Sequence, residues 1–319
     1  MIALILIGIA AGCASALMFA SIISGALISL LLFYLAPLPL MVAAIGWGPL
    51  AAAIGGCAAA GSLGIIFGLN YCIAFAVVFA LPAWWLGHLA LLGRPTAGPS
   101  SPDAAPDIPD LEWYPVGRIL VWIAVFATLT TFGVMLTLGS DPAAMTETLK
   151  RGLDQLLAAS GVTAEDQVVD ALIAIMPICA VIGVFVVLTF NLWLAAKIAA
   201  TSGRLRRPWP DLTATALPPF TLPALCVAIA LCFTGGLIAL LAKLVTSALM
   251  MAYAFAGFAV LHTLTMALKS RVFWLGSAYA IVVLFMWPVL AMVALGLADA
   301  VFGFRARYLR SRPPPLPAP

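Results

Sequence analysis

The sequence predicts an all-α protein: a polytopic transmembrane helical bundle of about eight crossings, with one amphipathic surface helix. Two observations predict this class. Of its 319 residues, 65% are hydrophobic and 8% are charged, whereas a soluble domain carries about 25% charged residues. Apolar runs of about 20 residues, long enough to cross a bilayer as a helix, recur along the chain. A water-soluble core cannot hide this much apolar surface, so hydrocarbon must surround most of it.

Eight apolar runs indicate the membrane helices. The first is too long for one straight crossing, so we expect it to break near Ser21–Gly25. The second is rich in glycine and contains Pro49, so we expect it to be broken or re-entrant. No basic region or cleavage motif marks the first residues, so we expect no cleaved signal peptide. The runs occupy residues 1–36, 38–68, 70–93, 117–139, 168–199, 220–242, 244–268 and 272–298.

Composition divides the chain into four segments. Residues 1–93 are N-terminal membrane helices, and residues 94–116 form a linker with six prolines and four acids. Such a segment cannot bury a core and is predicted to be solvated, on the cytoplasmic side. Residues 117–302 hold the C-terminal membrane helices, and residues 303–319 form a basic, Pro-rich cytoplasmic tail.

Residues 140–161 predict the amphipathic helix. Asp141 can cap its start, Pro142 suits its first turn and Gly161 suits its end. The helix is predicted to lie on the membrane surface or across the mouth of the bundle. Thr163 and Asp166 have the spacing of a capping box for the next helix, which Pro177 should kink. The apolar stripe of the amphipathic helix consists of Met145, Leu149, Leu153 and Leu156.

The distribution of lysine and arginine predicts the orientation in a bacterial inner membrane. Segment 197–211 is basic and segment 140–170 is acidic, so we expect the first in the cytoplasm and the second outside. The basic tail should also be cytoplasmic, although three apolar runs separate it from Arg207. We therefore expect a broken or re-entrant run near Gly235–Lys243. The arginines expected at lipid headgroups are Arg204, Arg206, Arg207, Arg305, Arg307, Arg310 and Arg312.

The tail is interpreted as a headgroup anchor. Asp299 and Arg305 are six residues apart, which places them on different faces of one helix and predicts no one-turn ion pair. Asp299 is expected to cap or tether a neighbouring loop, for which the basic loop is a candidate. The net charge of +3 is too small to suggest a nucleic-acid partner.

Chemistry-bearing motifs are few. No Asp or Glu lies at the middle of a run, which argues against a pump, an antiporter or a cation channel. The sequence contains no phosphate-binding loop, zinc-protease or hydrolase motif. We therefore expect no enzyme, no cofactor and no metal site, and the six cysteines are interpreted as small hydrophobes. A membrane-embedded Ser/His protease built on His262 is the remaining enzymatic alternative.

Two polar residues inside the runs, Asn191 and His262, are candidate ligand-binding groups. The alternatives are an interhelical hydrogen bond for Asn191 and core packing for His262. Small residues at four-residue spacing, including Gly8 and Gly12, allow close helix packing. Ala10 and Ala14 have the same spacing, and they are candidates either for packing within the bundle or for docking a partner subunit.

Several short stretches resemble YybS-type predicted membrane proteins: Asn191-Leu192 before a basic loop, LPPFTLP, GFAVLH and LGLADAVFGFRAR. That family is similar to the substrate-binding S components of energy-coupling-factor vitamin transporters, and more distantly to the rod-shape membrane scaffold MreD. In S components, small-residue spacing on the first helix docks the coupling subunit, which Ala10 and Ala14 match. The long linker and the additional runs differ from the usual six-helix S component.

Two functions are therefore expected. The leading one is a solute-binding transporter subunit that takes energy from a separate ATPase, because this chain has no nucleotide site. The alternative is a non-transporting scaffold or assembly protein of the cell envelope. In both, the lipid bilayer and other membrane subunits are the partners.

Overall fold

The computed structural model describes residues 1–95, 111–161 and 165–310, and these residues are almost entirely helical. The chain forms two compact units. The first comprises Met1–Thr130 and Gly183–Pro210, and the second Thr131–Ile182 and Asp211–Pro319. Two of the three boundaries fall inside helices, so α7 (Val116–Leu138) and α9 (Asp166–Thr201) contribute residues to each unit, and the third boundary lies between Pro210 and Asp211.

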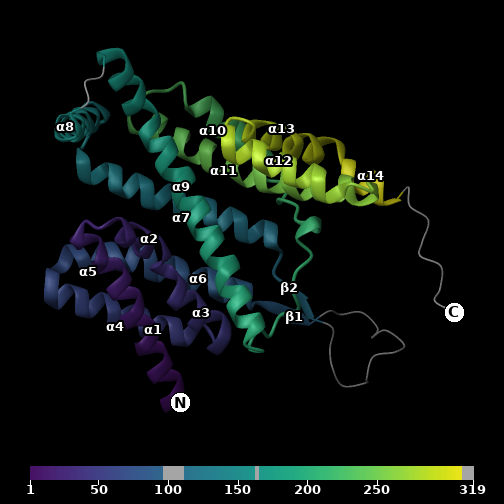
Figure 1. Ribbon diagram of the computed structural model, residues 1–319, viewed down its shortest axis with the longest axis horizontal. Coiled ribbons are helices and arrows are strands. Elements are labelled where there is room, and N and C mark those ends of the chain that lie inside the picture. Colours follow the sequence, from purple (N-terminus) through teal and green to yellow (C-terminus); the bar gives the residue numbers. More distant parts are fainter. Residues whose placement is uncertain (96–110, 162–164, 311–319) are drawn as a thin grey trace. The chain divides into compact units, whose positions relative to one another are not determined.

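Glycine and proline separate the helices of the first unit (Figure 1). The predicted break at Ser21–Gly25 is confirmed, since α1 gives way to a 3₁₀ turn that ends at Gly25, with φ of 67°. Gly48 and Gly68 also have positive φ, which L-residues rarely adopt, and each begins a new helix. The helices are α1 (Ile2–Ala20), α2 (Leu27–Leu35), α3 (Pro37–Trp47), α4 (Pro49–Phe67), α5 (Leu69–Phe75) and α6 (Leu81–Ala90).

Helices α1 and α4 pack against each other in parallel. A Cβ at Gly8 would meet the carbonyl of Ala51, and one at Gly12 would meet the carbonyl of Gly55. A Cβ at Gly55 would in turn overlap the carbonyl of Gly8. The contacts advance together along both helices, from Gly8 with Ala51 to Gly12 with Gly55, so the two helices run in the same direction. The packing predicted for the Gly8 and Gly12 spacing is confirmed.

The predicted linker is partly ordered at its two ends. A short antiparallel pair joins β1 (Gly93–Pro95) to β2 (Leu111–Trp113), which the sequence analysis did not predict. Arg94 and Glu112 face each other across the pair, with Nη2 and Oε2 2.7 Å apart. The rest of the linker, residues 96–110, lies outside the described residues.

The amphipathic helix is confirmed as α8 (Pro142–Ser160). Asp141 Oδ1 accepts hydrogen bonds from the amides of Ala143 and Ala144, and Gly161 ends the helix in a left-handed conformation. Met145 is buried, whereas Leu156 is exposed. Thr163 lies outside the described residues, so the predicted capping box is not described. On either side lie α7 (Val116–Leu138) and α9 (Asp166–Thr201), the second with Pro177 inside it.

In the second unit, α11 and α13 repeat the parallel glycine packing. A Cβ at Gly257 would overlap the carbonyl of Met292, and one at Gly296 would overlap the carbonyl of Tyr253. Thr263 near the end of α11 and Arg305 just beyond the end of α13 both reach the Thr213 carbonyl, so the two helices run in the same direction, and α12 returns the chain between them (Figure 1). The helices are α10 (Thr221–Leu231), α11 (Gly236–Leu264), α12 (Arg271–Phe285), α13 (Val289–Phe302) and α14 (Phe304–Arg310).

Two of the last runs are interrupted. The break expected near Gly235–Lys243 is present beside Gly235, between α10 and α11, whereas Lys243 lies inside α11. The run 272–298 is not one crossing, because α12 ends at Met286, with φ of 57°, and Pro288 precedes α13. Both α12 and α13 are shorter than the roughly 20 residues that a crossing needs.

Seven segments of the described residues are long and apolar enough to cross a membrane. The chain is a multi-pass membrane protein. The count of seven differs from the expected eight or so for two reasons. Runs 1–36 and 38–68 supply three segments instead of two. Run 220–242 supplies only the short α10 and the start of α11, and run 272–298 is divided, so neither supplies a segment of its own. The segments are Ile2–Ser24, Leu27–Trp47, Pro49–Phe67, Leu69–Ala90, Val116–Leu138, Asp166–Thr201 and Gly236–Leu264.

Candidate functional site

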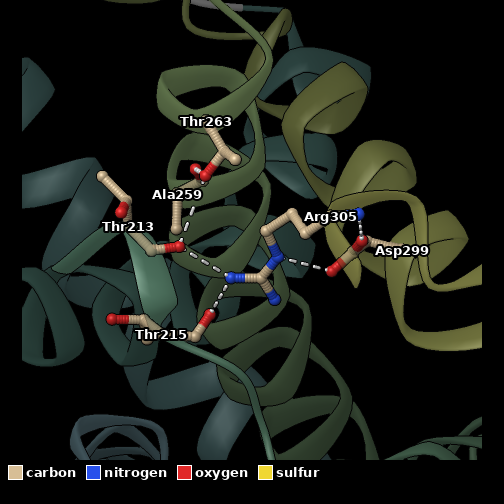
Figure 2. Close-up of polar contacts among 6 residues, drawn as sticks. All are labelled: Thr213, Thr215, Ala259, Thr263, Asp299 and Arg305. Atoms are coloured by element: carbon tan, nitrogen blue, oxygen red, sulfur yellow. Dashed lines mark hydrogen bonds and ion pairs between the residues drawn. The ribbon is translucent and has the colours of Figure 1, made fainter. Parts of the chain in front are cut away.

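A buried ion pair between Asp299 and Arg305 forms the most highly connected polar cluster of the second unit (Figure 2). Asp299 Oδ2 lies 2.7 Å from Arg305 Nε, and the two side chains are 7% and 12% exposed. The amide of Arg305 also donates to Asp299 Oδ1 at 2.9 Å. The sequence analysis excluded only a one-turn pair along one continuous helix, and the observed pair is not of that kind. Gly303, with φ of 64°, ends α13 and turns α14 back toward Asp299, which brings the two residues together.

The Nη1 group of Arg305 binds the backbone of the segment that precedes α10. Its Nη1 donates to the carbonyls of Thr213 and Thr215, at 3.0 and 2.6 Å (Figure 2). A guanidinium presents donors in a rigid planar fork, so it can hold a carboxylate and two carbonyls at once. Arg305 is therefore bound inside the protein, and the prediction that it contacts lipid headgroups is corrected.

Asp211 positions those two carbonyls. Its Oδ1 accepts from the Thr213 amide and hydroxyl, at 2.9 and 2.6 Å, and so caps a 3₁₀ turn over Leu212–Ala214. These hydrogen bonds, from the hydroxyl first and then the amide, lower the pKa of Asp211 below its ordinary value. Thr263 on α11 also approaches the Thr213 carbonyl, at 3.5 Å.

Residues 215–218 are not helical, although they lead directly into the apolar helix α10. Unpaired backbone groups are costly in hydrocarbon and need partners from the protein. Arg305 supplies a donor to Thr215, while the Thr221 hydroxyl donates to the Pro218 carbonyl at 2.7 Å. The ion pair thus stabilises a non-helical stretch of chain. It offers no free base or nucleophile for catalysis.

The other basic residues make varied contacts. Arg204 stacks over the Trp47 ring at 4.6 Å, and Arg206 is exposed. Arg207 Nη1 donates to the Tyr114 carbonyl at 3.0 Å, and burial lowers the pKa of its guanidinium. Arg307 donates to the Phe302 carbonyl. The Arg310 side chain and all of Arg312 lie outside the described residues, and headgroup binding by all of these arginines stays a prediction.

Asn191 joins two helices of the first unit. Its side chain is 1% exposed, and Nδ2 donates to the carbonyls of Tyr34 at 2.9 Å and Val187 at 2.8 Å. Tyr34 lies one residue before the end of α2, so this hydrogen bond fixes α9 against α2 close to the junction with α3. The Oδ1 of Asn191 is buried and accepts no hydrogen bond.

His262 is also engaged within the protein. Its Nε2 lies 2.8 Å from the Tyr279 hydroxyl on α12, and the Tyr279 ring stacks on Phe258 at 5.1 Å. Tyr279 thus lies against both Phe258 and His262, so the imidazole is in contact with a side chain of the protein. His262 and Asn191 belong to different units.

Ala10 and Ala14 are exposed on α1, on a face distinct from that of Gly8 and Gly12. The two small-residue patterns therefore differ: the glycines pack against α4, while the alanines face away from the unit. Partner docking at Ala10 and Ala14 stays a prediction.

An apolar groove lies between α10 and α11, with a volume of about 510 Å³. Its walls are apolar side chains, including Phe220, Val227, Ile238 and Val245. Among the described residues, no three His, Cys, Asp or Glu side chains are placed to hold a metal ion. The groove can thus accommodate hydrocarbon but has no polar groups that would orient a solute.

No protein-family model, curated protein or solved structure matches this chain. The sequence analysis also missed the carbonyls of Thr213 and Thr215, because backbone acceptors leave no mark in a sequence. Gly303 was the available signal, since a glycine between Asp299 and Arg305 permits a helix end.

Proposed function

We propose that this protein is a non-enzymatic scaffold or assembly subunit of the bacterial inner membrane, with its basic loop and tail in the cytoplasm. The observation that carries the proposal is the Asn191 amide, whose Nδ2 donates to the Tyr34 carbonyl and so joins α9 to α2, and donates also to the Val187 carbonyl within α9. His262 likewise bonds Tyr279. The groups expected to bind a solute thus stabilise the helices themselves, which favours a role in holding partners.

Quantitative co-purification in mild detergent tests this function. A scaffold should recover a defined set of envelope proteins, and two changes should reduce that recovery: deletion of residues 308–319, and the double substitution Ala10→Leu/Ala14→Leu. The deletion retains Arg305, so the ion pair with Asp299 is preserved. Ala58→Leu on the exposed face of α4 is the matched control for the leucines. Identical recovery from all four proteins would contradict the proposal.

A solute-binding subunit served by a separate ATPase is the second candidate. One observation favours it: Asn191 Oδ1 is buried and accepts no hydrogen bond, so it could accept one from a ligand. A panel of vitamins and their precursors should then raise the unfolding temperature of the purified protein, and Asn191→Ala should abolish this effect. Asn70→Ala, at an exposed amide, is the control.

A further inference from the structure

The charged residues of the first unit are confined to a few segments. The residues described there contain six cations and one acid, and none lies between Met1 and Gly93. The acid, Glu112, is paired with Arg94. The remaining cations therefore have no acidic partner among the described residues of this unit. The cations are Arg94, Arg118, Lys197, Arg204, Arg206 and Arg207.

Contacts bring these segments to one rim of the unit. Arg204 lies against Gly46 and Trp47 at the end of α3. Arg207 reaches the carbonyl of Tyr114, and the Tyr114 amide donates to the Leu92 carbonyl just beyond α6. Thus the C-terminal ends of α3, α6 and α9 meet the start of α7, near the β1–β2 pair (Figure 1). We call these segments the basic rim.

Tryptophan rings hold two of the rim's cations. Lys197 Nζ lies 4.2 Å from the centre of the Trp209 ring, and Arg204 Cζ lies 4.6 Å from that of Trp47. Tryptophan is enriched at the level of lipid headgroups. A cation held over a ring keeps N–H donors free for a phosphate, because the ring occupies only one side of it.

On the N-terminal side of Lys197, α9 has a stripe of exposed apolar side chains. Trp193, Phe190 and Val186 precede Lys197 by four, seven and eleven residues, so all four share one helix face. The three apolar side chains are 43%, 49% and 39% exposed, respectively. An apolar stripe that leads to an ammonium group matches a lipid, with its acyl chain along the helix and its phosphate at the top.

We propose that the α9 stripe and Lys197, supported by Arg204 and Arg206 in the adjoining loop, form a binding site for an anionic phospholipid. Charge complementarity selects the anionic headgroup, and the stripe selects a lipid over a soluble anion. Arg207 has a different role: its guanidinium donates a hydrogen bond to the Tyr114 carbonyl and so holds the segments of the basic rim together. The proposal is independent of the function proposed above.

The test titrates the purified full-length protein in neutral detergent with phosphatidylglycerol, phosphatidylcholine or glycerol 3-phosphate, and follows the unfolding temperature. Phosphatidylglycerol alone should raise it. Lys197→Gln should weaken phosphatidylglycerol binding about fivefold, the effect expected of one basic residue near anionic lipid. Lys197→Arg should restore binding. Arg151→Gln, which removes an exposed cation from α8, should leave binding unchanged.

Three results would overturn the proposal. Equal stabilisation by phosphatidylcholine would remove the role of charge, and equal stabilisation by glycerol 3-phosphate would identify a soluble-anion site instead. Unchanged binding in both Lys197→Gln and Phe190→Ala would exclude the α9 stripe. Each variant is first checked by gel filtration, and the arginine variant keeps the test decisive if the glutamine variant fails to fold.

Discussion

At the scale of single residues, we expect substitutions in the Asp299–Arg305 pair to change the stability of the protein most. Removing one partner of a buried ion pair leaves an uncompensated charge, which costs about 3–5 kcal/mol. Arg305→Met should therefore lower the stability of the second unit by about that amount and release the carbonyls of Thr213 and Thr215. Thermal unfolding in mild detergent measures the change.

A double variant distinguishes the contribution of the ion pair to stability from that of the surrounding packing. Asp299→Leu combined with Arg305→Met removes both charges, so it should cost clearly less than the sum of the two single changes. Arg307→Met is the control, since Arg307 is exposed and has no role in the pair. Additive losses would show that the two charges are not coupled.

Asp211 predicts a pH dependence in the same unit. Its pKa is lowered in the folded state by hydrogen bonds from Thr213. The stability it contributes is therefore present above its unfolded pKa of about 3.9 and is lost as the pH falls through the lower folded value. Asp211→Ala should cost about 1 kcal/mol at pH 6, as for other helix caps, and the difference should shrink below about pH 4. A constant difference at pH 6 and pH 3 would contradict this.

At the scale of helices, the glycines that join α11 to α13 should resist substitution. A side chain at Gly257 would overlap the carbonyl of Met292, so Gly257→Ala should force the helices apart and cost about 1–3 kcal/mol. Gly276→Ala on α12 is the control, because nothing lies within 4 Å of its added Cβ. The unfolding temperatures should separate the two variants, and equal values would show that the contact adds little.

Helix ends were predictable where the sequence carries their cause. The breaks at Ser21–Gly25 and Gly48–Pro49 and the caps of α8 follow from residues with restricted or unusual backbone geometry. The end of α12 was not predictable, because Met286 adopts a positive φ that its residue type disfavours. The candidate site around Asn191 was also predictable only in part. Asn191 could be recognised in the sequence as an amide inside a helix, but its partner, the Tyr34 carbonyl, depends on the fold.

At the scale of the whole molecule, the distribution of charge was predictable but the path of the last helices was not. The basic loop and the basic tail appeared to conflict because three apolar runs separate them. The structure removes the conflict within the second unit. Arg305 binds Thr213 and Thr215, and the end of α11 meets the same segment through Thr263. From the segment around Thr213 the chain therefore runs away along α10 and returns along α11, then runs away along α12 and returns along α13.

This path predicts the topology of the chain in the membrane. Helix α10 has 11 residues and spans only about 16 Å, so extended residues before it complete the first passage. Helix α11 brings the chain back to the side of the basic loop. Helix α12 then leads away from that side, and α13 leads back to it, parallel to α11. Single cysteines introduced at Ser202 and Ser311 in a cysteine-free background should therefore react with an impermeant maleimide from the same side of the membrane. A cysteine at Ser160 should react from the other side, because α9 crosses between Ser160 and Ser202. Labelling of Ser202 and Ser311 from opposite sides would mean that α12 and α13 form one crossing, and would contradict the turn at Met286.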